Sequence, residues 1–212
     1  MSDAVPELAG KVAIVVSGAG AIGAGIARGL TERGAEVVTA EAAIQSGAPR
    51  DAETVVAHCL AKYGRVDILV LVVADAAVPS APRSAAETDD AGAWDDAYAR
   101  DVVAMDGWLA AVSPGMVVRG YGKVLSVLSI AGRRADIGGE AEGAAMAAAI
   151  NLSQAWALRL APHAVNVNAI CLGAGEGAAC EDAVGPAAFL VSDRSRSITG
   201  QTLNVCGTLQ MN

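Results

Sequence analysis

The stretch Lys11–Val38, KVAIVVSGAGAIGAGIARGLTERGAEVV, decides the fold of this chain. It opens with Val12–Val16, an apolar run that is rich in β-branched residues and too short for a helix, which indicates a buried strand. The turn Ser17–Gly23 follows, and a helix is predicted from there to about Gly34. Its apolar residues recur at helical spacing, at Ile22, Ile26 and Leu30. A second strand is predicted at Glu36–Val38, and this order of strand, turn, helix and strand is typical of a dinucleotide-binding fold.

The glycines of the turn have the spacing G-x-G-x-x-G, at Gly18, Gly20 and Gly23. In such a turn the first two glycines allow a tight bend and the close approach of a pyrophosphate. The third glycine lets the helix pack on the strand, and the helix N-terminus faces the phosphates. The candidate cofactor-binding residues of this turn are therefore Gly18, Gly20, Ile22 and Gly23. The alternative is that the glycines only make a tight connection between strand and helix.

Glu41 follows the second predicted strand and is a fifth candidate for cofactor binding. A carboxylate about 20 residues past the glycines holds a ribose hydroxyl in such folds, and its charge would repel the additional phosphate of NADP. Glu41 would therefore select NAD. An equally simple interpretation is a solvated acid at the end of a strand.

Composition limits the class of protein. The 212 residues are expected to form a single domain, 1–212, with 53% hydrophobic residues and a formal net charge of −8, which argues against a nucleic-acid or anionic-membrane surface. The N-terminal residues lack a signal-peptide pattern, and no stretch is predicted to span a membrane. No metal site is expected, because His58 and His163 have no ligands at suitable spacing. Reduced, structural thiols and a cytoplasmic location are expected from the cysteines, Cys59, Cys171, Cys180 and Cys206.

The rest of the chain alternates predicted helices and strands. The helices are Asp51–Tyr63, Trp94–Val112, Glu140–Leu160 and Pro186–Val191, the first capped by Asp51. The strands are Val66–Val73, Lys123–Val127, Ala164–Ile170 and Thr202–Val205, and loops are expected at Pro79–Gly92 and Ser129–Gly139. The segment Ala42–Arg50 is too short for a crossover helix plus a strand. The sequence therefore predicts an α/β, Rossmann-like, doubly wound parallel sheet from which one strand is missing.

Two of the predicted helices bear on oligomerisation and packing. The part of the Glu140–Leu160 helix from Gly143 to Leu158 carries no charge and is apolar nearly all round, which indicates burial against a partner chain as well as the sheet. Self-association and a heteromer both satisfy this requirement. In the Trp94–Val112 helix, Trp94 and Tyr98 are predicted to pack rather than to form a ligand box.

The whole chain resembles the short-chain dehydrogenase/reductase (SDR) family, from Leu8–Val12 (LAGKV) to Ile198–Val205 (ITGQTLNV). The resemblance implies a seven-stranded parallel sheet and hydride transfer between NAD(P) and an alcohol or carbonyl. It also implies oligomers that pack through the helices near 94–112 and 140–160.

The family's cofactor motifs are altered in this chain. The glycine motif, T-G-x-x-x-G-I-G in the family, reads VSGAGAIG at Val16–Gly23. The N-N-A-G segment falls on Leu71-Val72-Val73-Ala74, where bulkier side chains should crowd the cofactor. The P-G and Thr that hold nicotinamide fall on Leu172-Gly173 and Gly177, and the following segment is too short for the usual substrate lid.

The family's catalytic positions are altered as well. Its active-site Asn falls on Asp101 and its Ser on Ser129. Its Tyr and Lys, which exchange the proton and hold the ribose, fall on Glu142 and Met146.

Three hypotheses follow. The first is a non-catalytic SDR-like subunit, with no catalytic residues and no cofactor expected, that assembles with an active SDR paralogue acting on a hydroxyacyl-CoA or a similar alcohol or ketone. A heterotetramer is favoured and a homo-oligomer is the alternative, each through the helices near 94–112 and 140–160. The second is an NAD-dependent oxidoreductase that uses Asp101, Ser129 and Glu142 as acid/base groups. The third is a nucleotide-binding sensor or scaffold.

Two adjacent arginines, Arg133 and Arg134, lie in the predicted Ser129–Gly139 loop. They would bind a CoA phosphate or an acidic partner, or would simply be solvated.

Overall fold

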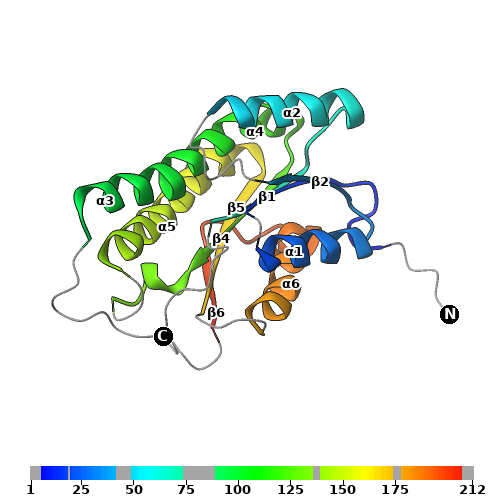
Figure 1. Ribbon diagram of the computed structural model, residues 1–212. Helices are drawn as coiled ribbons and strands as arrows, with labels where there is room; N and C mark the ends of the chain where they lie inside the picture. Colours follow the sequence, from blue (N-terminus) through cyan, green and yellow to red (C-terminus); the bar gives the residue numbers. More distant parts are fainter. Residues whose placement is uncertain are drawn as a thin grey trace.

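The computed structural model describes residues 6–18, 20–41, 49–73, 89–135, 139–173 and 178–206. Their strands form one parallel, six-stranded sheet in the order β2-β1-β3-β4-β5-β6 (Figure 1). The strands are β1 (Val12–Ser17), β2 (Glu36–Glu41), β3 (Ile68–Val72), β4 (Gly122–Ser129), β5 (Val165–Leu172) and β6 (Thr202–Val205). This is the doubly wound α/β fold that the sequence predicts.

Helices cover both faces of the sheet (Figure 1). The α-helices are α1 (Ala21–Glu32), α2 (Pro49–Tyr63), α3 (Ala91–Tyr98), α4 (Ala104–Arg119), α5 (Glu140–Leu160) and α6 (Ala178–Val191). The π-helical turn η1 (Ala99–Val103) joins α3 to α4, and short 3-10 turns lie at η2 (Ile130–Gly132), η3 (Ala161–His163) and η4 (Asp193–Ser195). Helices α2, α4 and α5 pack on one face, and α1 and α6 pack on the other.

The central strands are apolar along their whole length because both of their faces are covered. Every residue of β1, β3 and β4 is buried. Within β3, Leu69 and Leu71 belong to the core under α2, α4 and α5, whereas Ile68 and Val70 belong to the core under α1 and α6. Alternation along the strand thus builds two cores from one apolar run.

The prediction of a missing strand agrees with the observed sheet. Strand β2 lies at the edge of the sheet, and α2 already begins at Pro49. The described part of the chain holds six strands, where the family resemblance implies seven. The segment between β2 and α2 lies outside the described residues.

Several predicted helix limits are wrong. Helix α2 begins at Pro49, a residue suited to the first turn because it lacks an N–H to leave unpaired, so Asp51 lies inside the helix and does not cap it. The predicted Trp94–Val112 helix is the middle of a longer one that begins after Asp90, whose side chain accepts a hydrogen bond from the Ala93 N–H at 2.8 Å. Helix α6 begins at Ala178 and runs through Pro186, because the alanine-rich segment before the proline is a good helix former.

The strands also extend beyond some predicted limits. Strand β2 continues from Val38 to Glu41 because β1 supplies partners for each residue as far as Ser17. In the same way, β4 reaches Ser129 and β5 reaches Leu172, paired with each other at that point. The functional positions Ser129 and Leu172 therefore lie at strand ends rather than in loops.

The stretch Ala91–Arg119 is the one helical segment in the described residues that is long and apolar enough to cross a membrane. Its apolar residues nevertheless pack in the core on the sheet, at Met105, Trp108, Leu109, Val112 and Met116. Burial against the sheet accounts for its composition, as in a core helix. Trp94 and Tyr98, by contrast, are 38% and 39% exposed on α3, so their own chain does not fully cover them, and the prediction that they pack rather than form a ligand box stays a prediction.

Helix α5 has the limits that the sequence predicts. Its buried side chains recur every three or four residues, at Ala141, Ala145, Met146, Ala149, Ser153, Trp156, Ala157 and Leu160. The opposite side of the helix is exposed and uncharged as far as Leu158, whose side chain is 81% exposed. The helix is therefore buried on one side only within the single chain.

Candidate functional site

The candidate site lies at the carboxyl ends of the parallel strands. The chain moves outward from β1 to β2 and then crosses to the other side of β1 to form β3, so the strand order reverses between β1 and β3. Ligands of open parallel sheets bind at the carboxyl edge at such a point. The glycine turn leaves β1 there and leads into α1.

The last glycine of the turn packs the helix on the strand. A Cβ built on Gly23 would overlap the Cβ and Oγ of Ser17, so no side chain fits at this position. Gly20 is the N-cap of α1 in extended conformation, and Ile22 packs against the core under α1 and α6. Gly18 is half-buried between β1 and α1. The predicted role of Gly23 in packing is thus borne out, whereas cofactor binding by Gly18, Gly20, Ile22 and Gly23 stays a prediction.

Glu41 is the last residue of β2 and pairs in register with Ser17, the last residue of β1. Its backbone therefore lies beside the start of the glycine turn, at the same edge of the sheet. This is the position that the prediction of ribose recognition requires. Binding itself stays a prediction.

Ser129 ends β4 and is 1% exposed. Its Oγ accepts a hydrogen bond from the Ala131 N–H at 3.1 Å and so caps the short turn η2. The same turn packs tightly on α5, because a Cβ on Gly132 would come within 2.7 Å of the backbone carbonyl carbon of Met146. The hydroxyl of Ser129 thus caps the turn η2, which packs against α5.

Met146 is 2% exposed and belongs to the large core under α2, α4 and α5. Its thioether carries no ionisable proton. At this position the site holds a packing residue rather than a cation.

Asp101 is fully buried in the π-helical turn η1, where Arg100 holds it. Arg100 Nε donates to Asp101 Oδ1 at 2.7 Å, and its NH2 group donates to Oδ2 at 2.8 Å. Burial raises the pKa of Asp101, although the guanidinium partly offsets that rise. The hydrogen bonds to Asp101 in turn raise the pKa of Arg100.

Glu142 lies half-buried in the first turn of α5. Burial raises its pKa first, and the carboxylates of Asp101 and Asp89 raise it further, while Arg100 lowers it. Asp89 also accepts a hydrogen bond from the Ala141 N–H at 2.9 Å, which ties the start of α5 to the segment before α3. Three carboxylates and one guanidinium thus meet at this end of α5.

Sequence analysis missed Arg100 and Asp89. Asp89 fell in a segment predicted to be a loop, and its position just before a helix was the available signal. Arg100 is adjacent to Asp101 in the π-helical turn, and adjacent residues of a helix do not normally face each other, so the spacing does not indicate this pair. Nothing in the sequence indicates that turn.

The remaining candidate positions have structural roles or lie elsewhere. Arg133 NH1 donates to Asn204 Oδ1 at 2.8 Å, which holds β6 and favours neither a phosphate nor a solvated loop. His58 and His163 are exposed, and no group of three or more metal-ligating side chains occurs in the described ranges. Ala74 and Gly177 lie outside the described residues, as does the side chain of Cys180. Buried apolar side chains occupy the strand ends at Leu71, Val72, Val73 and Leu172.

The cysteines that the structure describes are free. Cys59 and Cys171 are buried, and Cys206 is partly buried. Burial raises the pKa of the Cys171 thiol to about 12 and also raises that of Cys59. These are the unreactive, structural thiols that the sequence predicts.

Comparison with known proteins identifies the family. The short chain dehydrogenase family model matches residues 43–183. The chain belongs to the short-chain dehydrogenase family. A curated relative, (2S)-[(R)-hydroxy(phenyl)methyl]succinyl-CoA dehydrogenase subunit BbsC of Thauera aromatica, is 32% identical over 86% of this chain and 78% of its own length.

Other members are similar over almost the whole chain. The 3-oxoacyl-[acyl-carrier-protein] reductase FabG of Salmonella typhimurium is 26% identical over 95% of this chain and 98% of the reductase. The 7alpha-hydroxysteroid dehydrogenase of Bacteroides fragilis is 30% identical over 94% of each chain. A crystal structure of the short-chain dehydrogenase/reductase type from Burkholderia xenovorans superposes with a TM-score of 0.80, covers 97% of this chain and 99% of its own, and is 23% identical. That likeness supports the fold.

Proposed function

We propose that this chain is a non-catalytic subunit of an NAD-dependent short-chain dehydrogenase complex, in which a paralogue with an intact Tyr-x-x-x-Lys pair carries out hydride transfer. The observation that carries the proposal is the core position of Met146, where the resemblance places the family's lysine. Glu142, at the position of the tyrosine, stands among carboxylates that disfavour its anion. Neither side chain can reproduce a phenol whose pKa is lowered by an ammonium.

No other tyrosine and lysine of the chain replace that pair. The tyrosines are Tyr63, Tyr98 and Tyr121, and the lysines are Lys11, Lys62 and Lys123. All three lysines lie toward the amino ends of the strands: Lys11 directly before β1, Lys62 in the last turn of α2, and Lys123 at the start of β4. The carboxyl edge therefore has no lysine in this fold.

Exposed apolar side chains on α5 and α3 support assembly with another chain. Leu158 is 81% exposed on α5, and Trp94 and Tyr98 are 38% and 39% exposed on α3. Exposed aromatic and aliphatic side chains that lie on one surface are typical of protein interfaces. The partner we propose is the active paralogue, in a heterotetramer formed through the helices near 94–112 and 140–160.

The substrate class rests on similarity to the Thauera protein. That relative is named as a subunit of a dehydrogenase whose substrate is a hydroxy acyl-CoA thioester. We infer that the complex containing this chain oxidises a hydroxyacyl-CoA or a related alcohol. The free cysteines and the family fold support a cytoplasmic location.

The proposal is tested by purifying the chain from its native host and weighing the intact assembly by native mass spectrometry. We expect a stoichiometric second short-chain dehydrogenase with an intact Tyr-x-x-x-Lys pair. A homo-oligomer without such a chain would overturn the proposal, as would NAD-dependent oxidation by the isolated protein. Leu158→Arg should release the partner, whereas Leu60→Arg, on exposed α2, should leave the assembly intact.

A second candidate function is an NAD-dependent oxidoreductase with Glu142 as the proton donor. It is supported by the raised pKa of Glu142 and by the close packing of α1 on β1 at Gly23, which the dinucleotide-binding motif requires of its third glycine. NAD would supply the hydride acceptor, Gly18, Gly20 and Glu41 would bind its phosphates and ribose, and the acid at Glu142 would exchange the substrate proton. Activity of the isolated chain that is lost in Glu142→Gln would establish this function, and unchanged activity in that variant would exclude Glu142.

NAD binding without turnover would define the remaining possibility, a nucleotide-binding scaffold. The G-x-G-x-x-G spacing favours pyrophosphate binding, whereas the apolar residues at the end of β3 offer no side-chain hydrogen bond to the nicotinamide half. Calorimetric titration of the isolated chain with NAD measures this directly.

A further inference from the structure

A cavity lies at the amino edge of the sheet, opposite the glycine turn. It has a volume of about 560 Å³, which is within the range of small-molecule sites. Its walls come from three segments far apart in sequence: the start of β4, the turn between α5 and β5, and the stretch from η4 toward β6. No part of the proposed cofactor site contributes to it.

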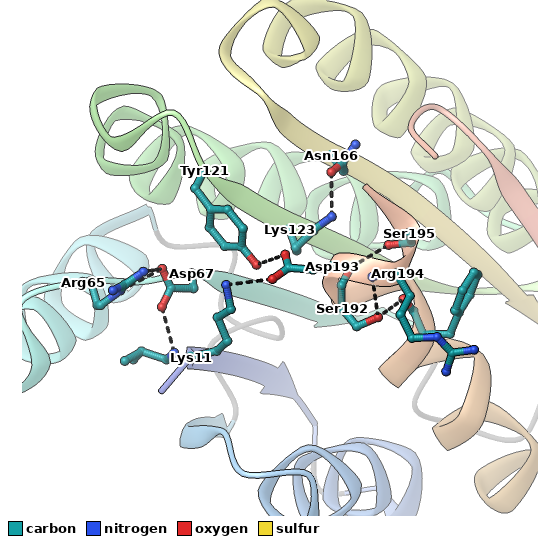
Figure 2. A network of polar contacts seen from close by, with 12 residues as sticks. Lys11, Arg65, Asp67, Tyr121, Lys123, Asn166, Ser192, Asp193, Arg194 and Ser195 are labelled. Atoms are coloured by element: carbon teal, nitrogen blue, oxygen red, sulfur yellow. Dashed lines mark hydrogen bonds and ion pairs between the residues drawn. The ribbon is translucent and has the colours of Figure 1, made fainter. Parts of the chain in front are cut away.

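Lys123 forms the buried part of this cavity. It is 2% exposed, and its Nζ donates a hydrogen bond to Asn166 Oδ1 at 2.8 Å (Figure 2). Lys123 and Asn166 are paired in register on β4 and β5, so the strand ladder fixes this contact. Both face the side of the sheet covered by α1 and α6, beyond the end of α6. A lysine held this deeply is unusual in a core.

The nearest carboxylate is already committed to other donors. Asp193 Oδ1 accepts a hydrogen bond from the Tyr121 hydroxyl at 2.8 Å, and Lys11 Nζ lies 3.3 Å from Asp193 Oδ2 (Figure 2). Lys11 also lies over the Tyr121 ring, 3.9 Å from its centroid. Arg196 lines the same cavity, and the structure records no ion pair for it within the described ranges. The cavity thus holds more positive than negative charge, although the chain as a whole is acidic.

Burial lowers the pKa of Lys123, with Asp193 opposing and Lys11 reinforcing that effect. The ammonium therefore lacks the full compensation that a buried charge requires. A bound anion would supply it. The other lining residues include two exposed apolar ones, Ala161 and Ala164, which can contact a hydrocarbon group.

We propose that this cavity binds a small organic anion, with a phosphate or carboxylate group on Lys123 and Arg196 and an apolar body against Ala161 and Ala164. The site is independent of the proposed dehydrogenase complex and of the glycine turn. It adds a ligand at the edge of the sheet that short-chain dehydrogenase chemistry does not use.

The experiment is calorimetric titration of the full chain with phenyl phosphate and with benzoate at constant ionic strength. We expect saturable binding of at least one of them by the natural protein. Lys123→Met should weaken binding about tenfold or more, because it removes the buried charge that the anion compensates. Lys62→Met, which removes an exposed lysine on α2, is the matched control and should bind as the natural protein does.

If Lys123→Met does not fold, Arg196→Gln provides an independent test of the same site. Arg196 is an exposed side chain, so this variant should keep the natural melting temperature and lose affinity several-fold. Unchanged affinity in Lys123→Met or in Arg196→Gln would place the anion elsewhere and overturn the proposal. Absence of binding by the natural protein at millimolar phenyl phosphate and benzoate would overturn it as well. If inorganic phosphate binds as tightly as phenyl phosphate, the apolar residues of the cavity do not contribute to affinity, and that part of the proposal is wrong.

Discussion

The two edges of the sheet are built from different residues. At the carboxyl edge, turns and helices approach the strands through glycines, and three carboxylates meet at the start of α5. At the amino edge, charged and aromatic side chains bind one another: Lys11, Arg65 and Tyr121 engage Asp193 and Asp67 (Figure 2). The comparison shows that Lys11 and Tyr121 stabilise the fold at the amino edge, through contacts with each other and with Asp193. At the carboxyl edge, the described ends of β3 and β5 carry buried apolar side chains.

At the carboxyl edge, we expect the largest loss of stability from a substitution at Gly23. Gly23→Ala places a Cβ inside the Ser17 side chain, so strand and helix must separate, and we expect a loss of about 3 kcal/mol in the free energy of unfolding. Urea denaturation measures it. Gly115→Ala in α4 is the control, because the added Cβ would meet only the flexible end of Arg119, and its effect should stay within about 1 kcal/mol. Equal stability of both variants would show that α1 does not pack on β1 as described.

At the amino edge, we expect the largest loss of stability from a substitution at Asp67. This buried carboxylate accepts a hydrogen bond from the Val12 N–H at 3.0 Å and from Arg65 at 2.7 Å and 2.9 Å. Asp67→Ala leaves the Val12 N–H unpaired in the core, while Arg65 can return to water, so we expect a loss of about 2–3 kcal/mol. Asp95→Ala on the exposed face of α3 should change stability by less than about 0.5 kcal/mol. If the Asp67 variant unfolds at the same urea concentration as the natural protein, the ion pair contributes nothing to this edge.

The contrast also explains what the sequence could and could not reveal. Strands β1 and β3 were predictable because an apolar run flanked by glycines or charges has few alternatives, and α5 because a long uncharged run, Gly143–Leu158, lies between acidic residues and Arg159. Asp51 was wrongly predicted to be a cap because Pro49 begins the helix instead. The pairing of Tyr121 with Asp193 joins residues 72 positions apart, and that of Lys123 with Asn166 depends on strand register. Local patterns carry no information about such contacts, so the amino-edge cavity was not predicted.

The carboxylates at the start of α5 should make stability depend on pH. The pKa of Glu142 is raised in the folded protein, so its contribution to stability is fully present below the ordinary carboxyl pKa and is lost as the pH rises through the raised value. Glutamine does not ionise, so in Glu142→Gln this pH-dependent loss of stability does not occur. Relative to the natural protein, this variant should gain stability as the pH rises from about 4 to 8, by less than about 1 kcal/mol because the side chain is half exposed.

Urea midpoints measured across this pH range for Glu142→Gln and for Glu53→Gln, an exposed residue of α2, separate the local effect from net charge. A parallel gain in both variants would mean that the overall negative charge, and not the neighbourhood of Asp101, is responsible. A gain confined to Glu142→Gln would show that ionisation of Glu142 at the carboxyl edge lowers the stability of the folded protein.

The smallest effect is expected at Tyr121. Tyr121→Phe keeps the ring over which Lys11 lies and removes only the hydrogen bond to Asp193, whose carboxylate is 61% exposed and can be hydrated instead. We expect a loss of about 0.5 kcal/mol in the free energy of unfolding. Tyr121→Leu removes the ring as well and should lose more, by the cation–π contribution of roughly 0.5–1 kcal/mol. If the two variants are equally stable, the aromatic face contributes nothing, and the amino edge is held by its hydrogen bonds and ion pairs alone. If Tyr121→Leu is the less stable, the aromatic ring under Lys11 stabilises the amino edge in addition to the hydrogen bond to Asp193.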